Sequence, residues 1–249
     1  MTTADQADHL MTTLLREPGR PRLTWYGGAG ERIELSGAVL VNWVAKTAAL
    51  AADELGLTEG DRVRLDLPAH WRTVVWVLAL WRAGVTVDLT DGHLVDAVVT
   101  DRPAPGSAPT VAVALGPLAR RFPGDLPAGS VDYAAAVLGY PDLPAPAATA
   151  PVATPALVGP GGTTTFAQLA PGGAGSSGRR TLLVIAEGRA STTFVLTTHD
   201  RLAENGSLVV VHPAAAGRLA DLAHQERVDR LGVRAPESIQ GRTRHAACP

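Results

Sequence analysis

A run of glycines and threonines, Gly159-Pro160-Gly161-Gly162-Thr163-Thr164-Thr165, contains the residue types that bind phosphate groups. Backbone N–H groups of such runs form anion-binding nests when a turn points them in one direction. The run follows a predicted short strand, Ala156–Val158, but no lysine follows it, so the P-loop pattern GxxxxGK(S/T) is not satisfied. The other interpretation, which the residues alone favour, is a β-turn that leads into a second strand over Thr164–Phe166.

Lysine is nearly absent from the chain, and this limits the chemistry available to it. Of the 22 basic residues only Lys46 is a lysine, and all the others are arginines. Codon bias in a high-GC genome explains this composition, which is also rich in alanine, glycine and proline. Any mechanism that needs an ammonium group must therefore use Lys46, which lies inside a predicted helix.

The other candidate residues give weaker signals. No two histidines have metal-binding spacing, and Cys248 has no partner placed by pattern, so neither a catalytic residue nor a metal site is predicted. His70 is placed to cap a helix, and His212 ends a predicted strand, where ligands bind in α/β sheets. Arg179-Arg180 could receive an anion but is typical of a solvated strand start.

Alternating strands and helices are predicted to position these residues. Strands are expected over Arg22–Tyr26, Glu31–Leu35, Asp61–Leu67, Val85–Leu89, Asp96–Asp101, Thr110–Leu115, Ala156–Val158, Thr181–Ala186 and Ser207–His212. Helices are expected from Ser36 to Leu55, and over Trp71–Ala83, Pro117–Phe122, Asp132–Leu138, Thr193–Glu204 and Ala215–Arg227. The alternation predicts a layered α/β/α domain with a largely parallel sheet covered on both faces.

Three parts of the chain are distinguished on this basis. Residues 1–19 are expected to form an N-terminal helix or flexible lead, residues 20–233 the α/β domain, and residues 234–249 a disordered tail. Tyr140–Pro155 is rich in proline and alanine and predicts an extended connector. Gly173–Gly178 matches GxGxxG, but a loop precedes it and a strand follows, so a flexible linker is predicted.

Composition and charge exclude several classes of function. The 249 residues carry a net charge of -2, which gives no basic field for nucleic acid or an anionic membrane, so neither is an expected partner. A single cysteine excludes a disulfide framework. Neither a signal or transit peptide nor a membrane-spanning stretch is recognised, so we expect a cytoplasmic protein.

Two blocks of sequence carry a family resemblance. Leu23–Leu89 runs from LTWY through an EL step and a helix ending in LGL to TEGDRVRLDLP, a buried helix and WRAGVTVDL. This order resembles the opening of the adenylate-forming superfamily, which includes acyl-CoA synthetases, nonribosomal adenylation domains and luciferases. Arg201–Val228 is similar to a later segment of the same family. The chain looks most like short, uncharacterised high-GC bacterial proteins that carry only the amino-terminal portion.

The resemblance implies a phosphate loop with departures. The family's loop has the form TSGTTG-x-PKG, and Gly159–Thr165 occupies the corresponding place. It keeps Gly161, Gly162, Thr163 and Thr164 but lacks the second glycine, the proline and the lysine that steadies the departing phosphates. The family's ribose-binding acidic residue and arginine, and its catalytic lysine on a small carboxy-terminal domain, are not recognised in this sequence. We therefore expect a degenerate AMP-binding domain without independent ligase activity.

The sequence leaves more than one ligand and partner possible. By resemblance alone, Gly159, Gly161, Gly162, Thr163, Thr164 and Thr165 are a weak site for ATP or AMP, and coenzyme A is another implied ligand. One alternative is a scaffold or interaction protein that retains only the fold, since fold does not fix function. Another is a ligase fragment that needs a partner chain. An open sheet edge favours a homo-oligomer or a partner protein.

Overall fold

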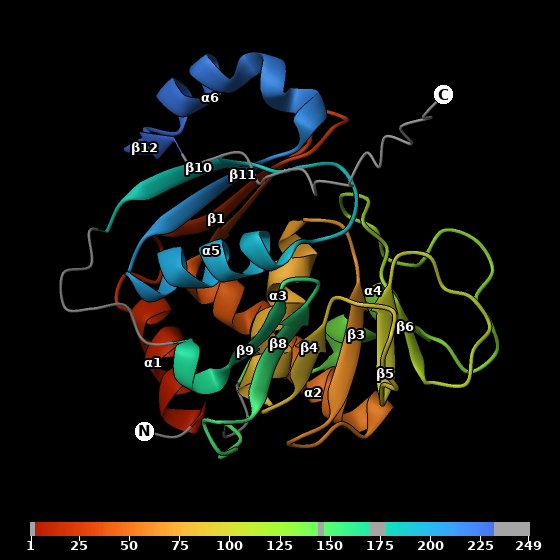
Figure 1. Cartoon of the computed structure of the whole chain (residues 1–249). Helices are drawn as coiled ribbons and strands as arrows, with labels where there is room; N and C mark the ends of the chain where they lie inside the picture. The colour runs from red at the N-terminus through yellow and green to blue at the C-terminus, as the bar shows by residue number, and fades with distance from the viewer. Residues whose placement is uncertain (1–2, 144–146, 170–177, 232–249) are drawn as a thin grey trace, which may run out of the picture.

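Two mostly parallel sheets and the helices between them make up the fold (Figure 1). The structure is a computed structural model that describes residues 3–143, 147–169 and 178–231. The α/β class and the parallel pairing predicted from the sequence are confirmed. The strands form two sheets, whereas the sequence pattern predicted one. The local alternation of strands and helices does not show which distant strands pair, so it could not indicate the second sheet.

Sheet A has the strand order β12-β10-β11-β1-β2 and sheet B the order β7-β6-β5-β3-β4-β8-β9. Sheet A is built from β1 (Pro21–Tyr26), β2 (Arg32–Ser36), β10 (Arg180–Val184), β11 (Ser207–Val211) and β12 (Arg230–Leu231). Sheet B is built from β3 (Arg62–Asp66), β4 (Thr86–Asp88), β5 (Ala97–Thr100), β6 (Thr110–Ala112), β7 (Val131–Asp132), β8 (Pro155–Gly159) and β9 (Gly162–Thr165). The antiparallel pairs are β1 with β2 and β8 with β9.

Most of the helical residues lie between the two sheets. The helices are α1 (Thr3–Leu15), α2 (Gly37–Leu55), α3 (Trp71–Arg82), α4 (Tyr133–Ala136), α5 (Thr192–Ala203) and α6 (Leu219–Gln225). The 3₁₀ turns are η1 (Val137–Gly139), η2 (Phe166–Gln168) and η3 (Pro213–Arg218). Both α3 and α5 contact strands of both sheets, whereas α6 lies on the far face of sheet A (Figure 1). Within the described residues, no helix is long and apolar enough to cross a membrane.

The caps predicted for α2 and α3 are present. The Ser36 side chain accepts a hydrogen bond from the Val39 N–H, and Gly56 ends α2 in the left-handed region at φ +64°. His70 begins α3, where its ring accepts a hydrogen bond from the Arg72 N–H at 3.1 Å. These local signals therefore define where the two long helices start and where α2 stops.

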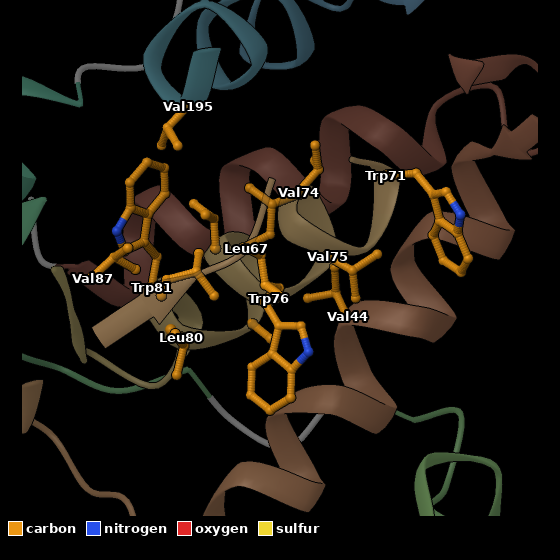
Figure 2. Packing of buried hydrophobic residues seen from close by; sticks show 14 of the residues in the cluster. Val44, Leu67, Trp71, Val74, Val75, Trp76, Leu80, Trp81, Val87 and Val195 are labelled. Carbon is orange, nitrogen blue, oxygen red and sulfur yellow. The ribbon is translucent and has the colours of Figure 1, made fainter. Parts of the chain in front are cut away.

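α3 is the centre of the main hydrophobic core, and all of its residues are buried. Trp76, Leu80 and Val75 are fully inaccessible, and α3 packs with residues of α2, sheet B and α5. Figure 2 shows Val44 of α2 beside Val75, and Val195 of α5 beside the ring of Trp81. A helix that is apolar on every side needs neighbours on every side. The two sheets and the other helices supply them, which is why one core reaches both sheets.

Buried ion pairs attach α6 to sheet A. Glu226, which follows α6, is 6% exposed, and its carboxylate accepts hydrogen bonds from Tyr26 (2.5 Å), Arg32 (2.9 Å) and Arg180 (2.5 Å). Burial alone would raise the pKa of Glu226, but these hydrogen bonds outweigh it and lower the pKa to about 2. Arg180 is therefore neutralised within the fold and is not a free anion site.

Two predicted helices differ from the structure. Pro117–Phe122 is a turn, because Leu118 lies in the left-handed region at φ +56° and its side chain is 91% exposed, so no apolar face packs there. Ala215–Arg227 begins as the 3₁₀ turn η3 and becomes α-helical only in α6, after Gly217. Two predicted segments lie outside the described residues: the linker at Gly173–Gly178, of which only Gly178 is described, and the tail at residues 234–249.

Candidate phosphate-binding hairpin

The Gly/Thr run forms a tight β-hairpin between β8 and β9. Gly159 pairs with Gly162, so Pro160 and Gly161 are the two turn residues. Gly162 has φ +121°, a conformation that favours glycine. The turn interpretation of this run is therefore correct for its backbone. Pro160 through Thr163 are exposed, so the tip of the hairpin is open to solvent.

Gly159 brings the base of the hairpin against the first turn of α5. A Cβ atom at this position would lie 2.1 Å from the Thr192 hydroxyl oxygen, so only glycine permits the contact. The first N–H groups of a helix have no intrahelical acceptor and favour anions. The Thr192 hydroxyl oxygen is itself buried without a hydrogen-bond partner among the described residues. The base of the hairpin and the start of α5 therefore lie side by side, with a buried hydroxyl at their contact.

The three threonines of the run do not act alike. Thr163 is exposed and Thr164 half-buried, and both belong to β9 beside the turn. Thr165, the last residue of β9, also caps η2, and the Gln168 side chain accepts hydrogen bonds from its N–H (2.8 Å) and its hydroxyl (3.3 Å). Thr165 therefore has a capping role in addition to its place in the predicted set, whereas Gly159, Gly161, Gly162, Thr163 and Thr164 lie in the hairpin itself.

Within the described part of the chain, the hydrogen bond and ion pair of Lys46 are made with residues outside the hairpin. Its ammonium group forms an ion pair with Asp142 at 2.9 Å and donates a hydrogen bond to the Tyr140 carbonyl oxygen. Tyr140 in turn donates from its hydroxyl to Asp53 (2.9 Å) on the same helix, α2. The ammonium group thus fastens the connector to α2 and is engaged away from Gly159–Thr165.

The two histidines singled out from the sequence lie at one end of the strands of sheet A. His212 follows β11 and caps η3 by accepting a hydrogen bond from the Ala214 N–H at 3.2 Å. Its ring lies edge-on to Trp25 of β1. The ring of the buried His70 also lies edge-on to Trp25, with 4.9 Å between the two ring centroids. Both histidines therefore have local capping roles. No group of three or more His, Cys, Asp or Glu side chains within the described ranges could hold a metal ion.

The contact with Thr192 was not predicted from the sequence. The pattern Ser191-Thr192-Thr193 before an apolar residue signals a helix start, and Ser191 does cap α5 by accepting from the Phe194 N–H at 3.2 Å. The signal located the helix, but it contained nothing about which strand the helix would meet.

Comparison with solved structures defines the class of the fold. The chain superposes on an acyl-CoA synthetase of Brucella canis with a TM-score of 0.71 and 16% identity, over 93% of this chain and 47% of that one. It superposes on the amide bond synthetase McbA of Marinactinospora thermotolerans with a TM-score of 0.64 and 18% identity, over 93% and 48%. The fold is that of acyl-CoA synthetase-like ligases, as the sequence resemblance implied.

Among sequences, the chain is 37% identical over 147 residues to a TIGR03089 family protein of Mycobacterium tuberculosis. That alignment covers 53% of this chain and 59% of the mycobacterial protein. No family model matches the chain. The chain spans about half the length of the two synthetase structures, and its similarity to them is one of fold.

Proposed function

We propose that this chain is a nucleotide-binding domain on an adenylate-forming ligase fold that does not complete ligation unaided. The ligand is ATP or AMP, with its phosphate group at the Gly159–Thr164 hairpin. The observation that carries the proposal is the close approach of Gly159 to Thr192, which joins a glycine-rich turn to the start of a twelve-residue helix. Such an arrangement favours a phosphate through backbone N–H groups alone.

The engagement of the single lysine at another place in the fold supports the second half of the proposal. Transfer chemistry at phosphate requires fixed positive charge on the departing group, and a lysine commonly supplies it. Lys46 is the only lysine in the sequence and is paired with Asp142. Backbone N–H groups can bind the phosphate of a bound nucleotide. Without the positive charge of a lysine, they add little stabilisation to the transition state in which pyrophosphate leaves.

Exchange of labelled pyrophosphate into ATP, with a panel of carboxylic acids, tests the catalytic part. We expect no exchange above the background of a protein-free reaction. The chain should be assayed at a concentration where ATP binding has first been established. Turnover by the purified chain would contradict the proposal and would favour a complete ligase.

Thermal unfolding with ATP, AMP and coenzyme A tests the binding part. A ligand that binds only the folded state raises the unfolding midpoint, and we expect ATP and AMP to do so. Gly159→Ala should abolish the shift because its methyl group displaces the hairpin from Thr192. Gly139→Ala is the matched control, since nothing lies within 4 Å of a Cβ there and Gly139 is outside the hairpin.

Thr163→Ala keeps the test informative if Gly159→Ala does not fold. Thr163 is exposed, so its loss should leave stability unchanged while it weakens the ATP-dependent shift. An absence of any shift at saturating nucleotide, together with a stable oligomer in light scattering, would instead favour the scaffold alternative.

A further inference from the structure

A polar cavity of about 310 Å³ lies on the face of sheet B opposite to α3. Its floor is formed by β3, β5 and β6, and its walls by the loops at residues 93–95 and 104–108. The volume is at the small end of the range for small-molecule sites, which runs from about 300 to 1,000 Å³. The cavity is therefore large enough for a compact metabolite.

The strand register places the floor residues in rows. Arg64 of β3 is paired with Val98 of β5, which is paired with Thr110 of β6. In the next row Asp66 is paired with Thr100. Side chains in one row point to the same face of a sheet, so a guanidinium, an apolar side chain and a hydroxyl lie side by side.

Arg64 has an unfilled hydrogen-bonding capacity at this floor. Its Nε atom is buried and has no hydrogen-bond partner among the described residues. Its one ion pair in the described ranges is with Asp91 at 3.9 Å, and Asp91 is 97% exposed, so that pair contributes little. A buried donor without a partner is uncommon in folded proteins and often marks the place of a bound ion or water.

The carboxylates around Arg64 are engaged with other groups. Asp88, its neighbour on β4, accepts hydrogen bonds from the Thr90 N–H (2.8 Å) and hydroxyl (2.6 Å), and contacts His93 at 2.7 Å. Asp66 pairs with Arg189 at 2.7 Å, and Arg102 lies 3.5 Å from it at the cavity wall. The carboxylates nearest to Arg64 are thus held by other groups, and its guanidinium lines the cavity with a buried N–H that lacks a partner among the described residues.

We propose that this cavity binds a small organic anion whose carboxylate or phosphate group faces Arg64. A guanidinium presents a planar fork that matches such an oxyanion with two parallel hydrogen bonds. Arg102 adds a second positive charge at the wall, and the Ser107 hydroxyl is a further donor there. Val98 and Leu94 provide apolar contact for a short carbon skeleton. The site is separate from the hairpin, which meets α5 on the inner side of sheet B.

Titration of the full chain with succinate and with glycerol 3-phosphate tests this assignment, one probe for each oxyanion. Amide chemical shifts should change at Val98, Thr100 and Thr110 with at least one probe. Arg64→Met should weaken that binding by about 10- to 100-fold, the amount that a charge-assisted hydrogen bond contributes. Arg201→Met is the matched control, because Arg201 is similarly half-buried but pairs with Glu204 on α5.

Arg64→Lys and Gly159→Ala complete the design. Arg64→Lys keeps the positive charge but loses the planar fork, so its affinity for the probe should lie between those of the native chain and Arg64→Met. If Arg64→Met folds poorly, the loss of affinity in Arg64→Lys relative to the native chain still tests the proposal. Gly159→Ala should leave binding at the cavity unchanged, which separates it from the hairpin. The proposal would be overturned if Arg64→Met bound the probes as tightly as the native chain. It would also be overturned if the chemical shifts changed only at other surfaces, or if neither probe bound at the highest concentration used.

Discussion

His70 is a buried histidine that the fold holds in its neutral form. It is 5% exposed, caps α3 through its ring nitrogen and packs edge-on against Trp25. Burial is the main cause that lowers its pKa, to about 3, and electrostatic interactions with the nearby Arg72 and His212 side chains add to it. The ordinary pKa of histidine, about 6.5, applies once the chain is unfolded.

Stability should therefore depend on the protonation of His70. Between pH 6.5 and pH 3 the unfolded chain binds a proton at this position that the folded chain does not. The stabilisation from neutral His70 is complete above pH 6.5 and is lost as the pH falls through this window. Well below pH 6.5 the loss amounts to about 1.4 kcal/mol for each pH unit.

His70→Asn should flatten that dependence. Asparagine caps a helix but does not titrate, so the variant loses packing at every pH yet has a smaller slope between pH 6.5 and pH 4. Urea unfolding at several pH values measures both quantities. His9→Asn, at an exposed position on α1, is the control and should keep the native slope. An unchanged slope in His70→Asn would show that other groups control the acid response.

α1 is attached to the rest of the fold by a buried arginine and a close backbone approach. The fully buried Arg22 donates hydrogen bonds to the carbonyl oxygens of Thr13 (3.2 Å), Asn205 (2.8 Å) and Gly206 (3.3 Å). A Cβ atom at Gly37 would lie 2.1 Å from the Leu14 carbonyl oxygen. The end of α1 therefore contacts the start of α2 without space for a side chain.

Gly37→Ala should displace α1 from α2. The added methyl group meets backbone rather than a flexible side chain, and overpacking of this kind costs about 1–3 kcal/mol. Hydrogen exchange should show faster exchange in α1, and urea unfolding should show the loss of stability. Gly139→Ala, where nothing lies within 4 Å of a Cβ, should change neither. Equal protection of α1 in both variants would mean that the contact relaxes at no cost.

Local sequence signals predicted most of the helices and strands, but they did not predict the contacts between elements that are distant in the sequence. Ser36 and Gly56 mark the start and the end of α2, as serine and glycine at these positions predict, because capping involves only neighbouring residues. The alternating charges of β3 correctly indicated a strand. They contained no information that Arg64 would lie beside Val98 and Thr110, since that row depends on strand pairing. The hairpin was likewise predictable as a turn, but its contact with α5 was not.

At the scale of the whole molecule, two hydrophobic cores of unequal size hold the layers together. The main core is centred on α3 and reaches both sheets, whereas a second core lies between sheet A and α6. Tyr26, Leu182, Val209, Val211 and Leu222 are the buried members of the second core. Regions with few buried apolar contacts open at lower free energy than the rest of a protein. The α6 layer should therefore open before the two sheets separate.

Leu222→Ala and Leu80→Ala distinguish that order of opening from a single cooperative unit. Both leucines are buried, and truncation in a core costs about 2–5 kcal/mol. Leu222→Ala should speed amide hydrogen exchange in α6 and leave α3 and β3 protected, because the second core can open alone. Leu80→Ala should lower protection in both sheets, since its core reaches them both. If Leu222→Ala lowered the protection of α3 as much as that of α6, the layers would unfold together, and Glu226 with its arginine partners would be the interaction that couples them.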